Sequence, residues 1–202
     1  TPTPTLTSTV ESISLYPYWH VPRKIAVEEL LPAIQQDSSY LRRNDFEVLD
    51  KNGAVRIPAT LDWKKFNKDY FPFSLRQREG TRNSLGIIKF VFDNPYAVFL
   101  HDTNAKGLFR RNVRALSPGC IRMEKAVELA RYLVPEPGTI DKRQKKKKQI
   151  TLGVRRPIRI YVRYFTCESK DDALEFYDDI YRLDRNMIKS LYNPERTKLS
   201  SL

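Results

Sequence analysis

His101 and Cys120, nineteen residues apart, are the two side chains of this sequence whose types could do chemistry together. A thiol attacks a carbonyl carbon effectively only as the thiolate, and a nearby imidazole can take its proton. His101 ends a predicted strand, where a side chain can leave the core and face a cleft. Cys120 follows Gly119, which permits close backbone approach, and precedes a predicted helix whose amino-end dipole would favour a thiolate. The pair predicts a nucleophile and its base.

Short apolar runs and turn residues indicate the elements that must position this pair. Residues 87–92 and 97–100 are predicted strands joined by the turn at 93–95, where Pro sets φ and Asp and Asn bond their own backbone. A helix is predicted after Cys120, with one apolar face made of Ala126, Val127, Ala130 and Leu133. Apolar and polar residues alternate over 158–164, which predicts a strand with one buried face.

The rest of the chain gives weaker signals. Residues 1–19 favour a strand ending in an aromatic turn, and 23–36 favour a helix that Pro32 kinks or restarts. Residues 40–83 are charged, aromatic and irregular, as in an inserted subdomain of short pieces. The helical spacing of Leu174, Tyr177, Ile180 and Tyr181 predicts an amphipathic helix packed on the sheet. Periodicity alone therefore supports an α+β domain with more strand than helix around the site.

Composition narrows the class of protein. The chain has 202 residues, 41% of them apolar, which suits one compact domain. Its formal charge is +12, and residues 142–148 supply six of the positive charges; we expect this run to be a solvated hairpin tip. A basic balance permits nucleic acid, anionic lipid or an acidic wall polymer as partner. No apolar run reaches the roughly 18 residues of a membrane helix.

Several kinds of site are not indicated by the sequence. Two cysteines at this spacing suit neither a zinc cage nor a disulfide framework, and Cys167 is interpreted as a structural thiol. His20 has no acidic or cysteine partner at metal-ligand spacing and is interpreted as a surface or turn residue. The seven glycines form no phosphate loop, which argues against nucleotide chemistry. We predict no metal and no organic cofactor.

The residues around the pair resemble the signature of the L,D-transpeptidase catalytic domain. That signature is a His, about fifteen residues, then Ser-His-Gly-Cys, an apolar residue, and Arg or Asn. The matching segments here are His101-Asp102-Thr103, Leu108-Phe109 and Arg114-Ala115-Leu116-Ser117-Pro118-Gly119-Cys120-Ile121-Arg122. The resemblance extends to residues 16–22 and 83–90, and it covers roughly residues 1–165. It points to the larger Gram-negative type with a capping subdomain.

The resemblance implies a mainly β, α+β fold: a β-sandwich core with flanking helices and a capping subdomain inserted at about 24–82. The catalytic region would span 1–165, and 166–202 would be a helical extension packed on the core. Family domains begin with strands that this chain is expected to lack. A periplasmic location follows from the implied substrate, with export by a leader that is not in this chain.

The resemblance also implies a mechanism. Cys120 would attack the amide between the L-centre of diaminopimelate and D-alanine in a donor tetrapeptide stem, releasing D-alanine and leaving a thioester. An amine of a neighbouring stem would resolve it to a 3→3 peptidoglycan crosslink, whereas water would make the protein an L,D-carboxypeptidase. His101 would act as base and then as acid, and Ser117 would orient the imidazole.

Further residues are assigned by the same resemblance. Backbone amides of Gly119 and Cys120 would form the oxyanion hole, without a contribution from Pro118, which has no N–H. Arg114 and Arg122 could bind stem carboxylates through forked hydrogen bonds, or brace the loop. Phe99 and Trp19 could line the substrate cleft, or belong to the core.

Two other readings remain open. The first is a catalytically weakened cell-wall-binding module of the same fold, which a carbapenem adduct on Cys120 would exclude. The second is a nucleic-acid-binding domain, favoured by net charge and the lysine run, which leaves the signature unexplained. We expect the partners to be donor and acceptor peptidoglycan stem peptides rather than nucleic acid.

Overall fold

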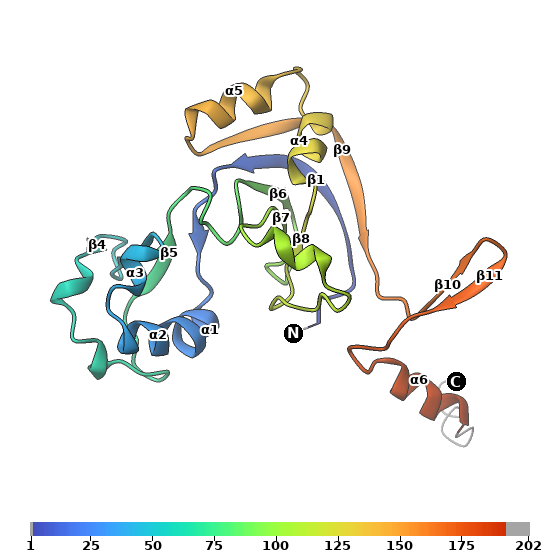
Figure 1. The fold of residues 1–202 in the computed structure, drawn as a ribbon, viewed down its shortest axis with the longest axis horizontal. Helices are drawn as coiled ribbons and strands as arrows, with labels where there is room; N and C mark the ends of the chain where they lie inside the picture. The colour runs from blue at the N-terminus through green and yellow to red at the C-terminus, as the bar shows by residue number, and fades with distance from the viewer. Residues whose placement is uncertain (1, 193–202) are drawn as a thin grey trace, which may run out of the picture.

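A five-stranded sheet forms the centre of the computed structural model, which describes residues 2–192. Its order is β8-β7-β6-β1-β9, and the strands are β1 (Leu6–Leu15), β6 (Ile88–Phe92), β7 (Leu100–His101), β8 (Ile121–Arg122) and β9 (Ile150–Val162). β1 pairs antiparallel with β6 and β9, β6 pairs antiparallel with β7, and β7 pairs parallel with β8. The strands at the β8 edge are short, so the sheet narrows toward the predicted site (Figure 1).

One face of this sheet carries the main core. In β6 every second residue is buried, as alternation requires, and Ile13 and Leu15 of β1 pair with Phe90 and Ile88. Two helices, α4 (Ala126–Leu133) and α5 (Thr139–Lys146), pack on this face through Ala126, Ala130, Leu133 and Ile140. The predicted helix after Cys120 is therefore confirmed, with its predicted apolar residues turned to the sheet.

A second, smaller sheet lies beside the first and has its own core. Its order is β2-β5-β3-β4, with β2 (Trp19–His20), β3 (Phe46–Leu49), β4 (Val55–Arg56) and β5 (Ser74–Gln77). Around it lie α1 (Arg23–Ile25), a π-helix η1 (Ala26–Leu30), α2 (Leu31–Gln36), α3 (Tyr40–Arg43) and two 3₁₀ turns, η2 (Pro58–Thr60) and η3 (Trp63–Lys65). Val48, Leu75 and Trp63 belong to its buried cluster. The domain division at 24–82 remains a prediction, but this region buries side chains of its own.

Pro32 was expected to kink the helix or to start a second one, and α2 begins beside it. The helical segment from Arg23 to Gln36 is continuous, and Pro32 stands in the first turn of α2. Proline lacks the N–H that an α-helix would direct at the carbonyl four residues earlier. The preceding residues widen into the π-helix η1, a form that often accompanies such an interruption.

The carboxyl-terminal extension differs from its prediction. Residues 167–176 form a hairpin of β10 (Cys167–Lys170) and β11 (Ala173–Phe176), followed by α6 (Asp184–Tyr192). Asp171 and Asp172 both adopt positive φ, which closes a tight hairpin turn between β10 and β11. This turn interrupts the helical spacing seen in the sequence. The predicted helix through Leu174 and Tyr177 is therefore wrong.

The extension was expected to pack on the core, but it does not. Leu174 and Phe176 are 66% and 74% exposed, and the hairpin and α6 project from the sheet (Figure 1). Residues 193–202 of the predicted extension lie outside the described residues. Tyr164 links the extension to the body. Its ring centre lies 5.0 Å from that of Tyr181 in a tilted arrangement, and its hydroxyl donates to Asp179 Oδ1 at 2.8 Å.

The lysine-rich run is a helix rather than a hairpin tip. It forms most of α5, because buried Ile140 anchors one face while the lysines point outward to water. The Tyr16 hydroxyl donates to Gln144 O at 3.0 Å and ties the helix to the end of β1. β9 starts at Ile150, so the strand predicted for 158–164 is longer than the alternation alone indicated. The mainly β, α+β class is confirmed.

Candidate active site

The strand register places the chemically important side chains on one face of the sheet. Lys89 of β6 pairs with His101 of β7, and His101 pairs with Arg122 of β8. Paired residues on neighbouring strands share a face, and residues two apart along a strand share it too. Phe99 and Cys120, each two residues before a member of this row, therefore belong to the same face. His101 and Cys120 thus lie on one sheet face, in the neighbouring segments of β7 and β8.

Cys120 stands at the entry to β8 and not at a helix end. The Ile121 amide donates to Phe99 O at 2.9 Å, and the Met123 amide donates to His101 O at 2.8 Å, which fixes the strand that carries the thiol. α4 starts at Ala126, beyond β8. The expected helix-dipole contribution is therefore wrong, since that effect is confined to the first turn of a helix. The thiol is half-buried.

His101 is 4% exposed and has a defined tautomer. Its Nδ1 is hydrogen bonded to the carbonyl oxygen of Asp102. A carbonyl can only accept, so Nδ1 carries the proton and Nε2 remains the basic nitrogen. Burial lowers the pKa of His101 from its usual 6.5, and the positive charges of Arg122 and Lys89 act in the same direction, while the Asp102 carbonyl opposes them. The imidazole is thus held neutral, as a proton acceptor must be.

Asp102 supports this arrangement and was not identified from the sequence. Its side chain is buried, where Oδ2 accepts the Ile87 amide at 3.0 Å and Oδ1 forms an ion pair with Lys106 Nζ at 2.6 Å. Lys106 also donates to Glu124 O at 2.6 Å, which links the end of β7 to the segment after β8. Both ends of the carboxylate are therefore fixed, and with them the carbonyl that orients His101.

Gly86 makes room for that carboxylate. Its φ is +61°, and a Cβ added there would lie 2.4 Å from Asp102 Oδ2. A side chain at this position would meet both backbone strain and a fixed neighbour. The segment Asn83-Ser84-Leu85-Gly86 thus supports the site indirectly, through Asp102. In the sequence, the signal for this role was a glycine placed just before a strand.

The turn before Cys120 is organised by Ser117. Its hydroxyl donates to Cys120 O at 2.7 Å and accepts the Gly119 amide at 3.2 Å. The side chain therefore braces the turn, and the hydrogen-bond partner of His101 Nδ1 is Asp102 instead. Pro118 has no N–H and the Gly119 amide is occupied, whereas no acceptor is found for the Cys120 amide among residues 2–192.

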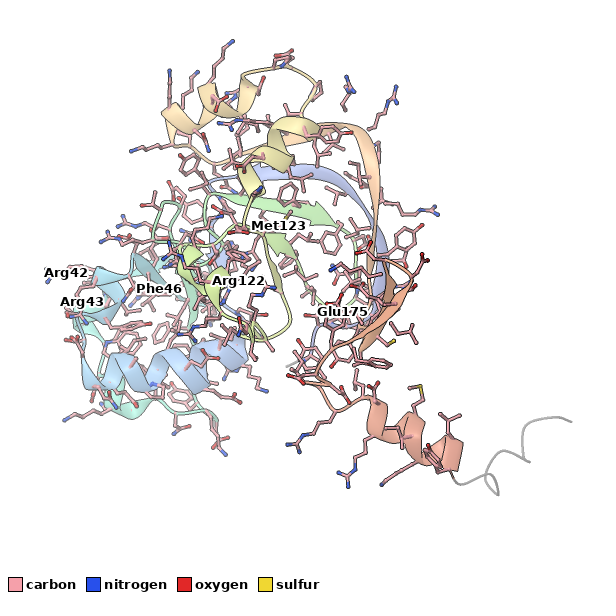
Figure 2. All side chains as sticks on the ribbon, turned by 45° about the vertical axis from the view of Figure 1, so that its right-hand side comes forward. Arg42, Arg43, Phe46, Arg122, Met123 and Glu175 are labelled. Atoms are coloured by element: carbon pink, nitrogen blue, oxygen red, sulfur yellow. The ribbon has the colours of Figure 1, made fainter. Side chains whose placement is uncertain are left out.

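A cavity of about 270 Å³ opens beside Cys120. Its lining consists of Thr3, Leu108, Phe109, Arg114, Ala115, Leu116, Ser117, Cys120, Ile121, Arg122 and Tyr181. The predicted binding residues Arg114 and Arg122 both contribute to this lining. In the view of Figure 2, Arg122 and Met123 lie in the middle of the molecule, between Phe46 and Glu175. Tyr181, contributed from 60 residues further along the chain, had no local sequence signal.

Two predicted residues are placed differently. Phe99 lies on the Cys120 face but under Lys89, whose Nζ is 3.5 Å from the centre of its ring. Trp19 packs against Phe46 at 6.1 Å, beside the core of the second sheet. None of the described residues that line the cavity comes from 24–82. His20 is exposed on β2, as its interpretation required.

A half-buried thiol and a buried imidazole that is protonated on Nδ1, carried on one face of adjacent strands, are an arrangement suited to acyl transfer through sulfur. The L,D-transpeptidase catalytic domain family matches residues 1–159. A Haemophilus influenzae protein that carries a provisional L,D-transpeptidase name is 33% identical over 189 residues, which cover 92% of this chain and 38% of that protein. The chain belongs to the L,D-transpeptidase catalytic domain family. It spans less than half the length of this relative.

Residues 2–192 contain neither a candidate metal-binding cluster nor a candidate membrane-spanning helix. No group of three or more His, Cys, Asp or Glu side chains gathers there at metal-binding distance. No helix in this part of the chain is both long and apolar enough to cross a bilayer.

Proposed function

We propose that this chain is the cysteine-dependent catalytic region of a peptidoglycan L,D-transpeptidase that forms 3→3 crosslinks. Family membership supports the reaction class. The placement of Cys120, His101 and Arg122 on one face of two adjacent strands, β7 and β8, supports the assignment to particular residues. The cavity beside the thiol offers two arginines to an anionic peptide stem, which bears free carboxylates.

The proposed first step forms a thioester. His101 Nε2 takes the proton of the Cys120 thiol, and the thiolate attacks the carbonyl carbon between diaminopimelate and D-alanine of a tetrapeptide donor. The tetrahedral oxyanion faces the Cys120 amide, and its collapse breaks the C–N bond. The imidazolium returns its proton to the departing amine of D-alanine.

The second step determines the product. An acceptor stem amine attacks the thioester, transfers its proton to His101 and releases the Cys120 thiol, which yields a crosslink. Water in place of the amine gives carboxypeptidase activity. A second stem that enters the cavity lined by Arg114 and Tyr181 would supply the amine for crosslinking.

The alternative is a catalytically weakened wall-binding module. The observation that favours it is the turn at Ser117 to Cys120, where one amide is missing and one is occupied. Loss of one oxyanion donor costs on the order of 3 kcal/mol of barrier. A carbapenem acylates an active nucleophile, so a mass adduct on Cys120 argues against this alternative.

The substrate implies a location and partners. Crosslinked wall lies outside the inner membrane, so we place the protein in the periplasm, with donor and acceptor stems as its partners. The mechanism needs no cofactor and no nucleic acid.

The decisive experiment incubates the chain with purified tetrapeptide muropeptides and identifies the products by mass. The expected products are crosslinked dimers and free D-alanine, both absent with Cys120→Ala. A Cys167→Ala variant is the matched control and should behave as wild type. Acyl transfer that persists in Cys120→Ala would exclude the proposed nucleophile.

A further inference from the structure

The thiol of Cys120 lacks two common sources of positive potential. It does not stand at a helix amino end, because β8 separates it from α4. Its own turn offers few donors, since Pro118 has no N–H and the Gly119 amide bonds to Ser117. A nucleophilic thiolate is normally favoured by such dipoles or by a nearby cation. A cation on the same sheet face must therefore be considered.

Lys89 is the cation that the fold places there. It pairs with His101 across β6 and β7, so its side chain shares the face that carries Phe99 and Cys120. Its Nζ lies 3.5 Å from the centre of the Phe99 ring. The carbonyl of Phe99 in turn accepts the amide of Ile121, the residue that follows Cys120. A cation held over an aromatic face is confined without being neutralised.

No acidic side chain pairs with this lysine. Among the ion pairs of residues 2–192 there is none between Lys89 and an Asp or Glu. The side chain is half-buried, where a charge is costly unless something favours it. A half-buried, unpaired cation on a catalytic face suggests a role for its charge.

We propose that Lys89 is a positioning residue whose fixed charge favours the Cys120 thiolate, an inference that rests on the proposed nucleophilic role of Cys120. Burial lowers the pKa of Lys89, and the Cys120 thiolate acts in the opposite direction. Arg122, on the other side of His101, lowers the pKa of the imidazole. Burial is the main cause that keeps the base neutral, and the charges of Arg122 and Lys89 add to it. Lys89 in addition favours the ionised nucleophile.

The role involves no transfer of atoms to the lysine. The thiol proton goes to His101 Nε2, the sulfur keeps the electron pair, and Lys89 remains an ammonium throughout. The titratable and charged groups on the Cys120 face are Lys89 from β6, His101 from β7 and Arg122 from β8, and Arg114 also lines the cavity. Tyr181 is the other titratable group on the lining.

The test measures the pH dependence of Cys120 alkylation by iodoacetamide, followed by peptide mass in a Cys167→Ser background. In Lys89→Met the stem still covers Phe99 but the charge is gone. We expect the midpoint of the profile to rise by about one pH unit, since a nearby opposite charge shifts a group by roughly one to three units. Alkylation at neutral pH then slows about tenfold. Lys89→Arg keeps the charge and should keep the midpoint.

Lys51→Met is the matched control, because Lys51 is exposed in the turn between β3 and β4, and its midpoint should equal that of the parent. A thermal melt confirms that each variant is folded, and Lys89→Gln repeats the test if the methionine variant is not. An unchanged midpoint in a folded neutral variant overturns the proposal.

The outcome is separable from the proposed function, because alkylation requires no peptidoglycan. A shifted midpoint in a chain that makes no crosslinks would keep the role of Lys89 and reject the enzyme activity. Crosslinking by the wild type together with an unshifted neutral variant would do the reverse.

Discussion

The two cysteines of this chain are equally half-buried, yet the regions that hold them differ in charge. Cys120 enters the edge strand β8, on a face that it shares with Lys89, His101 and Arg122. Cys167 starts β10 in a two-stranded hairpin, opposite Phe176. Exposure alone would rank the thiols as alike. The strand register separates them, because it decides which charges share a face with each sulfur.

The hairpin around Cys167 is locally acidic. Glu168 pairs with Glu175 across it, and Lys170 Nζ lies 3.4 Å from Glu175 Oε2. A hydrogen bond to Glu168, followed by desolvation and the second carboxylate, raises the pKa of Tyr177. Groups that become anions are thus disfavoured in this hairpin, whereas the β6–β8 face carries two cations, Lys89 and Arg122.

The largest expected effect concerns the base. His101→Gln should lower kcat/KM for a tetrapeptide donor by about 10³-fold, because glutamine cannot accept the thiol proton. His20→Gln is the matched control, since His20 is exposed on β2, and it should change kcat/KM less than about twofold. Steady-state assays of D-alanine release measure both. Equal losses in the two variants would contradict the distinction between the face that carries Lys89, His101 and Arg122 and the rest of the surface.

The next effect concerns Gly86, which makes room for the Asp102 carboxylate next to His101. Gly86→Ala should lower the free energy of unfolding by about 3 kcal/mol, because it adds positive-φ strain and a contact with the fixed Asp102 carboxylate. Gly53→Ala also stands at positive φ but meets nothing within 4 Å, so it should cost about 1 kcal/mol. Urea titrations compare the two. A cost for Gly86→Ala no larger than that for Gly53→Ala would contradict the close fit.

Several of these features were readable from the sequence, because they depend on local chemistry. The signature from His101 to Cys120, the turn at Asn94 and the role of Pro32 were all predicted. Asn94 Oδ1 does accept the amides of Tyr96 and Val98, at 3.1 and 3.0 Å, as an Asx-type turn requires.

Other features depend on which strands become neighbours, and the sequence does not contain that directly. Asp102 was visible beside His101, but its ion pair with Lys106 and its contact with Gly86 require the folded sheet. Tyr181 reaches the cavity from the far end of the chain. The helical spacing around Leu174 was overruled by the two aspartates at positive φ, which turn the chain into a hairpin.

A pH profile tests the charge of the catalytic face. In the proposed mechanism acyl transfer requires neutral His101, whose pKa is lowered from 6.5 by burial, Arg122 and Lys89. The acid limb of kcat/KM should therefore have its midpoint below 6.5, and the protein should lose stability as pH falls through that window, where unfolded chains bind the extra proton. Arg122→Gln removes a positive charge and should move the midpoint upward, while Arg110→Gln should not.

Two results for the midpoint of the acid limb would contradict this prediction. A midpoint above 6.5 in the wild type would mean that carboxylates outweigh the buried cations, and the contrast with the acidic hairpin would be lost. A midpoint that falls in Arg122→Gln would contradict the assigned direction of its charge.

The smallest expected effect belongs to the other cysteine. Cys167→Ser exchanges a sulfur for a hydroxyl on a half-exposed strand that pairs with one neighbour, so the free energy of unfolding should change by no more than about 0.5 kcal/mol. D-alanine release should stay within about twofold of wild type, and carbapenem adducts should still form at a single site. A second adduct on Cys167 in the wild type would show that half-burial suffices for reactivity, and that the register of β6 to β8 adds nothing to the thiol it carries.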